Sequence, residues 1–140
     1  MVRPVVDRHR GKVVFNAADA KDRVGGATFT VGAEATNAIT VNVQLQDEAG
    51  NDIAAVAAVP WYLTSDAAGQ TIPAAPSGGT AAGTDGTLIE WTAQLSGLAI
   101  SEADGDIDIV ITDTSTRDLY LHLVLPSGFI TTSGIISFST

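Results

Sequence analysis

The strongest constraint on the fold is a strict alternation of apolar and polar residues over residues 38–46. The apolar positions are Ile39, Val41, Val43 and Leu45, and polar residues occupy the positions between them. Successive side chains of a strand point to opposite faces, whereas a helix would scatter these four around its circumference. The pattern therefore predicts a strand with one buried face, as in an antiparallel sheet.

The same period of two recurs along the rest of the chain. Residues 47–52 contain Gly50 and Asn51, which suit a turn, so a hairpin to a strand over residues 53–64 is expected. Pro60 places that strand at a sheet edge or a bulge. Residues 70–86 are rich in Pro and Gly and predict a long loop or an edge strand with little pattern. Further strands are predicted over residues 87–93, 105–112, 119–125 and 129–138.

These elements predict an all-β protein, an antiparallel β-sandwich of immunoglobulin-like type with about seven strands and an extended N-terminal arm. A small barrel is the alternative. The 140 residues are enough for one domain, and a hydrophobic content of 45% can supply a core. The chain has no cysteine, so the immunoglobulin-like interpretation rests on strand count, on Trp61 as a core residue and on Tyr120 as a corner tyrosine.

Charge divides the chain into two parts, a basic arm over residues 1–24 and a sandwich domain over residues 25–140. The arm holds six of the seven basic residues and three acids, whereas the rest has Arg117 alone against thirteen acids, a formal charge of −12. This acidic body argues against binding to nucleic acid. No stretch approaches the roughly 18 apolar residues of a membrane span, and neither a secretion signal nor an anchor is expected.

The arm is predicted to bind an acidic partner, a neighbouring copy or the body itself, with a loose solvated tail as the alternative. Its apolar residues would anchor it and its basic residues would steer it. The predicted partner-binding residues are Arg3, Val5, Val6, Arg8, Arg10, Lys12, Val13, Val14, Phe15, Lys21 and Arg23.

The sequence has no pattern typical of an enzyme, and no catalytic residue is predicted. His9 lies in the charged arm, His122 lies within a predicted strand, and Ser127 is explained by turn chemistry. Without cysteine, disulfides and thiolate metal sites are excluded.

Two groups of residues are candidates for ligand binding. Asp104, Asp106 and Asp108 could hold Ca²⁺ through carboxylate oxygens, although the spacing of an EF-hand is missing; a solvated acidic strand is the alternative. Trp61 and Trp91 could form a platform on which a sugar stacks, or they could be core residues. No other cofactor is expected.

Residues 47–53, 62–66, 101–108 and 121–128 together resemble small immunoglobulin-like virion proteins of tailed bacteriophages, of the capsid decoration (head cement) type. The resemblance spans residues 27–138. It implies a non-enzymatic structural protein on the capsid surface of the virion. Its partners would be the major capsid protein and neighbouring copies of itself, in a homo-oligomer for which a trimer is favoured. The alternative is a carbohydrate- or host-surface-binding module of a phage tail or fibre.

Overall fold

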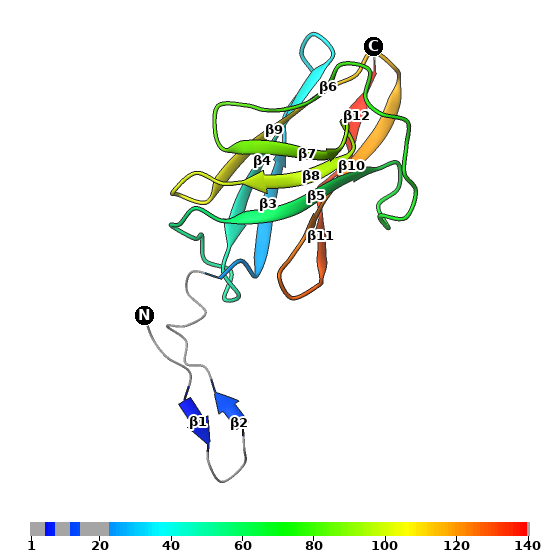
Figure 1. The fold of residues 1–140 in the computed structure, drawn as a ribbon. Coiled ribbons are helices and arrows are strands. Elements are labelled where there is room, and N and C mark those ends of the chain that lie inside the picture. The colour runs from blue at the N-terminus through cyan, green and yellow to red at the C-terminus, as the bar shows by residue number, and fades with distance from the viewer. Residues whose placement is uncertain (1–4, 8–11, 15–22, 140) are drawn as a thin grey trace.

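The computed structural model describes residues 5–7, 12–14 and 23–139, and this part of the chain is built from strands (Figure 1). None of the described residues forms a helix long and apolar enough to cross a membrane. The strands are β1 (Val5–Asp7), β2 (Lys12–Val14), β3 (Gly26–Val31), β4 (Ala38–Gln46), β5 (Ala58–Thr64), β6 (Gly79–Ala82), β7 (Thr87–Thr92), β8 (Ser96–Ile100), β9 (Asp106–Thr112), β10 (Arg117–Val124), β11 (Ile130–Thr132) and β12 (Ile136–Phe138).

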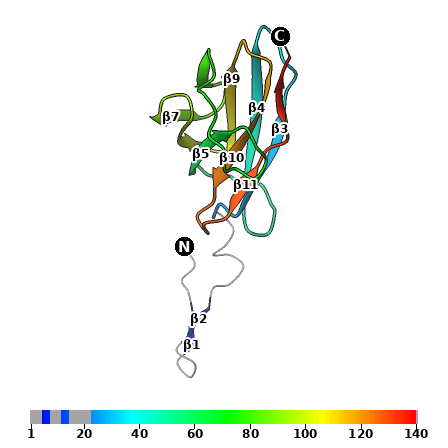
Figure 2. The same ribbon diagram turned by 90° about the vertical axis from the view of Figure 1, so that its right-hand side faces the viewer.

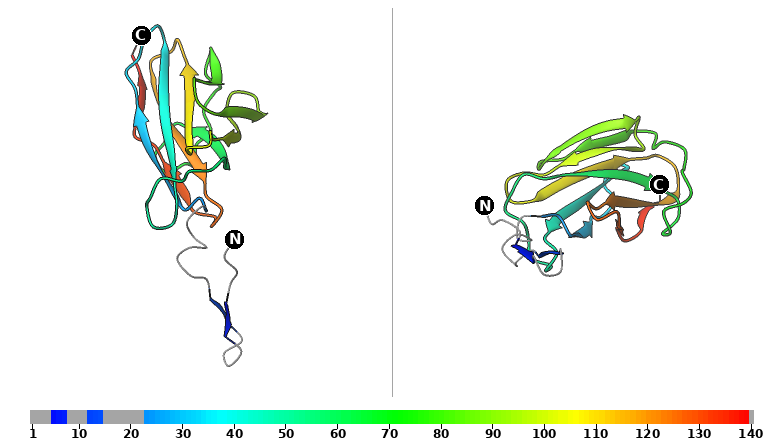
Figure 3. Two further views of the ribbon diagram at one scale, coloured as in Figure 1. Left: turned by 90° about the vertical axis from the view of Figure 1, so that its left-hand side faces the viewer. Right: turned by 60° about the horizontal axis from the view of Figure 1, so that its bottom comes forward.

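Two antiparallel sheets form the body. The four-stranded sheet has the order β3-β4-β9-β6, and the six-stranded sheet has the order β11-β10-β5-β8-β7, with β12 also paired to β10. Figures 2 and 3 show the two sheets as separate layers. The predicted all-β sandwich is confirmed, whereas the immunoglobulin-like features stay a prediction.

The core lies between the two sheets. All four apolar residues of the alternating run in β4 are buried, as the sequence predicts, and the opposing layer contributes Trp61 from β5. Alternation explains this arrangement, because each strand turns every second residue toward the other sheet. The core also contains Leu63, Ile107, Ile109, Ile111, Leu119, Leu121, Leu123, Ile136 and Phe138.

The sandwich has more strands than the seven expected. The Pro- and Gly-rich residues 70–86 contain the edge strand β6, the second of the two interpretations given for them. Residues 129–138 divide into β11 and β12, which pair with successive parts of β10. Strands β3 and β8 have no counterpart among the predicted strand ranges.

Two expectations about β5 are wrong. The turn at residues 47–52 forms, with Asp47 accepting hydrogen bonds from the amides of Ala49 and Asn51 and with an antiparallel bridge between Gln46 and Asp52. The chain then crosses to the other sheet, so β5 does not pair with β4 as expected. Strand β5 also lies inside its sheet, between β10 and β8, although it contains Pro60. The ladder to β10 runs from Trp61 to Thr64, so the residue without an N–H lies just beyond its end.

Strands β1 and β2 form a separate two-stranded sheet. Val5 lies opposite Val14, Val6 opposite Val13 and Asp7 opposite Lys12. The described residues of the arm therefore form an antiparallel pair of strands, which we call the N-terminal hairpin.

Candidate interaction surfaces

The arm joins the sandwich at Val24, which is buried against the core. The next residue, Gly25, donates a backbone hydrogen bond to Gln46 at 2.8 Å. A Cβ atom at Gly25 would lie 2.5 Å from the Cα of Glu48, so any larger residue would push the two segments apart. The point at which the arm leaves the sandwich is therefore fixed.

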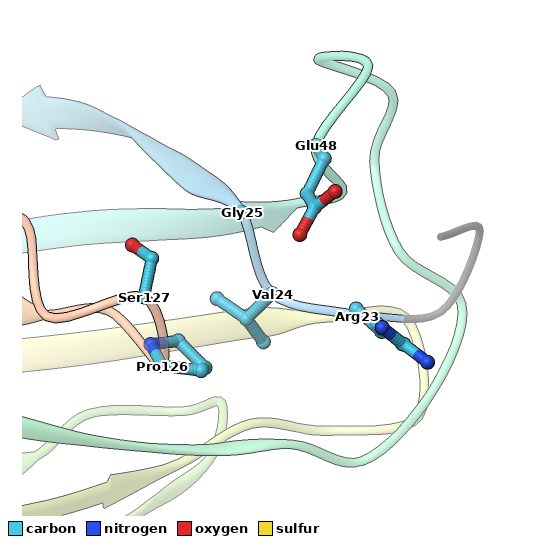
Figure 4. Close-up of a pocket in the computed structure, with 6 residues that line it drawn as sticks. All are labelled: Arg23, Val24, Gly25, Glu48, Pro126 and Ser127. Atoms are coloured by element: carbon cyan, nitrogen blue, oxygen red, sulfur yellow. The ribbon is translucent and has the colours of Figure 1, made fainter. Parts of the chain in front are cut away.

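A shallow pocket lies at this junction (Figure 4). It brings the start of β3 together with the loop after β4 and the turn after β10. Its lining residues are Arg23, Val24, Gly25, Glu48, Pro126 and Ser127.

The structure places only part of the predicted partner-binding set. Val5, Val6, Lys12, Val13 and Val14 lie in β1 and β2. Arg23 is exposed at the junction. The remaining members, Arg3, Arg8, Arg10, Phe15 and Lys21, lie outside the described residues.

The predicted calcium ligands are only partly brought together. Carboxylate oxygens of Asp106 and Asp108 in β9 and of Asp85 lie within 4.8 Å of one another. Asp104 is not in this group; its side chain instead accepts a hydrogen bond from the amide of Asp106 at 3.2 Å, which closes the turn into β9. Asp85 could not be found from local spacing, because its loop is distant in sequence from β9 and the fold alone brings it there.

Two of these carboxylates already accept hydrogen bonds from neutral side chains. The amide nitrogen of Asn42 donates to Asp106 at 2.7 Å and to Asp108 at 2.9 Å, and the Thr84 hydroxyl donates to Asp108 at 2.7 Å. The hydrogen bonds from Asn42 and Thr84 lower the pKa of Asp108 below its ordinary value. Desolvation and the neighbouring carboxylate of Asp108 raise the pKa of Asp85. Calcium binding stays a prediction.

His122 lies in a network of hydroxyl groups and is fully buried. The Thr64 hydroxyl donates its one proton to the carbonyl of Asp66 at 2.6 Å, so it accepts at 2.6 Å from Nε2–H of His122. Nδ1 then accepts from the Thr132 hydroxyl at 2.8 Å. This network assigns the neutral Nε2–H tautomer. The imidazole also stacks on Tyr62 at a centroid distance of 4.7 Å.

Burial lowers the pKa of His122, and the nearby carboxylate of Asp66 opposes this effect only in part. Both ring nitrogens are hydrogen-bonded to threonine hydroxyls of neighbouring strands, and the loop at Gly69 covers the ring on the side of the sheet that faces away from the core. These contacts explain His122 as a structural residue.

Arg117 is engaged within the sandwich. Its guanidinium donates to the buried carboxylate of Asp113, with Nε at 2.8 Å, and to the carbonyl of Ala74 at 2.8 Å. The backbone amide and the hydroxyl of Ser115 donate to the same carboxylate. Burial raises the pKa of Asp113, but these hydrogen bonds outweigh it and the pKa lies below its ordinary value. Residues 25–140 contain no other basic residue, so the one cation of the sandwich is committed to an internal ion pair.

The two tryptophans do not form a common platform. Trp61 is 1% exposed and fills the core, so its part in the predicted sugar site is wrong. Trp91 is 63% exposed, next to an irregularity in the pairing of β7 with β8. Only Trp91 is accessible for stacking on a ligand.

Comparisons of the chain with family models, with curated proteins and with solved structures found no match.

Proposed function

We propose that the chain is a non-enzymatic virion structural protein of a tailed bacteriophage, which binds the outer capsid surface and reinforces contacts between capsid subunits. The observation that carries this proposal is the pairing of an acidic sandwich with a basic N-terminal segment that forms a hairpin of its own. Such a segment can attach to a partner by main-chain hydrogen bonds and by charge, while the sandwich stays outside.

The resemblance to capsid decoration proteins adds support. Its four segments fall on the turn after β4, the end of β5, the turn into β9 and the end of β10. They therefore come from both sheets of one sandwich, as expected if the likeness concerns the whole domain.

The experiment is co-sedimentation of the full-length protein with capsids of the phage that encodes it. Replacing Arg3, Arg8 and Arg10 by glutamine removes three positive charges from the segment, and we expect the bound fraction to fall at least about tenfold. The control Thr28→Glu/Thr30→Glu/Thr40→Glu makes the same change in net charge on the exposed side of the four-stranded sheet and leaves binding close to that of the wild type. Equal loss in both variants would show that total charge, and not the segment, determines binding.

A second candidate is a carbohydrate-binding module of a tail or fibre, which the exposed Trp91 favours. In a Trp61→Phe variant, Trp91 is the only tryptophan, so a saccharide that stacks on it would change the tryptophan fluorescence. A glycan screen with that readout, and with Trp91→Phe as the matched control, separates this function from capsid binding.

A further inference from the structure

The outer face of the six-stranded sheet carries a row of apolar residues. Ile89 of β7 lies opposite Leu98 of β8, and Leu98 lies opposite Pro60 of β5. On the far side, Val124 of β10 lies opposite Ile130 of β11. Trp61 and Leu123 are partners that face the core, so the neighbouring residues Pro60 and Val124 share the outer face. We call these five residues the outer apolar row.

This row is unusual for the outside of a sandwich, where polar residues normally alternate with the core residues. The four-stranded sheet follows that rule, with Thr28, Thr40 and Asn42 on its outer face. In the row, by contrast, Ile89 is 46% exposed and Ile130 is 52% exposed. An apolar face next to an exposed edge strand marks a surface that a partner covers.

The edge of the sheet beside the row is formed by β7, whose Glu90 accepts a hydrogen bond from the Thr80 hydroxyl of β6 at 2.9 Å. Strand β7 ends the order of the sheet and pairs only with β8 among the described strands. It contains no proline or lysine, the residues that usually protect an edge, and its one charged residue is Glu90.

The hairpin of β1 and β2, in turn, requires a surface on which to pack. It consists of two strands of three residues each, and a two-stranded sheet of this size is marginal in water unless it packs on another surface. Its register sets valine opposite valine at two successive positions. The arm that carries it holds six basic residues, whereas the sandwich has a formal charge of −12.

We infer that the N-terminal hairpin of a second copy of this chain packs on the outer apolar row. Two sandwiches that meet face to face would set −12 against −12, whereas a basic arm inserted between them reduces the repulsion and supplies apolar cover. Each copy offers one arm and one row, so the contact is heterologous and closes into a ring if the rotation allows. The inference assigns the valines of the hairpin to a neighbouring copy, whereas the proposed function assigns the arginines of the arm to the capsid. It is tested on the protein without capsids and does not depend on capsid binding.

Three full-length variants test it. The row variant is Ile89→Lys/Ile130→Lys, in which two added positive charges repel the basic arm. Its control is Thr28→Lys/Thr40→Lys, which makes the same charge change on exposed positions of the other sheet. The arm variant is Val5→Ser/Val14→Ser. Circular dichroism and thermal unfolding show whether each variant is folded.

Native mass spectrometry and sedimentation velocity then give the oligomeric state. We expect the wild type and the control to associate, and the dissociation constant of the row variant and of the arm variant to rise at least about tenfold. A mixture of those two variants restores association, because the intact arm of one binds the intact row of the other.

The other outcomes would overturn the inference. An arm variant that associates like the wild type would show that the sheets meet directly. A wild type that is monomeric over a wide range of concentration would place the arm on its own sandwich or on a different protein. If the mixture fails to associate, the arm does not bind the row.

Discussion

Removing the carboxylate of Asp113 is expected to destabilise the sandwich strongly. Its side chain is 1% exposed and accepts from the amide and hydroxyl of Ser115 and from the guanidinium of Arg117, which is 23% exposed. Asp113→Ala leaves these donors without their partner. The loss of a buried, charged acceptor of this kind costs about 3 kcal/mol, which for a domain of this size lowers Tm by roughly 10 °C.

Urea unfolding, followed by the fluorescence of the buried Trp61, measures this change. Asp118→Ala is the matched control, since Asp118 lies exposed on the same strand as Arg117, and we expect a change within about 0.5 kcal/mol. The pKa of Asp113 is depressed, so its contribution is present above the ordinary pKa of 3.8 and is lost as the pH falls through the folded-state pKa. A loss below about 1 kcal/mol at pH 7, or a loss equal to that of the control, would refute the reasoning.

Two further predictions concern protonation. Burial lowers the pKa of His122 in the folded state, so the unfolded chain binds the proton first; stability is complete above pH 6.5 and declines as the pH falls from there to the folded-state pKa. In His122→Gln the free energy of unfolding should not show this decline with falling pH. An unchanged decline would show that other groups cause it. Asn42→Ala removes the shared donor of Asp106 and Asp108, so the pKa of Asp108 should rise in an NMR titration, with Thr40→Ala as the control. An unchanged Asp108 titration in Asn42→Ala would show that other groups set its pKa.

The predictable part of the fold was the part with a strong local pattern. Strand β4 begins and ends at the predicted residues, because eight of its nine residues, 39–46, alternate without interruption. Strands β6 and β8 are short and rich in glycine and alanine, and they become strands through their neighbours. The crossing from β4 to β5 could not be predicted, because a turn sequence shows where the chain bends and not which sheet it enters next.

The candidate sites were likewise predictable only where local spacing brings their residues together. Asp106 and Asp108 lie two residues apart on one strand, so local spacing placed them together, whereas Asp85 reaches them only through the pairing of the sheet. The outer apolar row draws one residue from each of five strands, and no local pattern could show it. Trp61 and Trp91 look alike in the sequence, but one faces the core and the other faces solvent.

We propose that this protein binds the capsid from outside and strengthens it. The most direct measurement is the temperature at which purified capsids come apart, first stripped of the protein and then with full-length protein added back. We predict a higher disassembly temperature after addition, with the effect removed by the Arg3→Gln/Arg8→Gln/Arg10→Gln variant. Capsids that come apart at the same temperature with and without bound protein would contradict the claim.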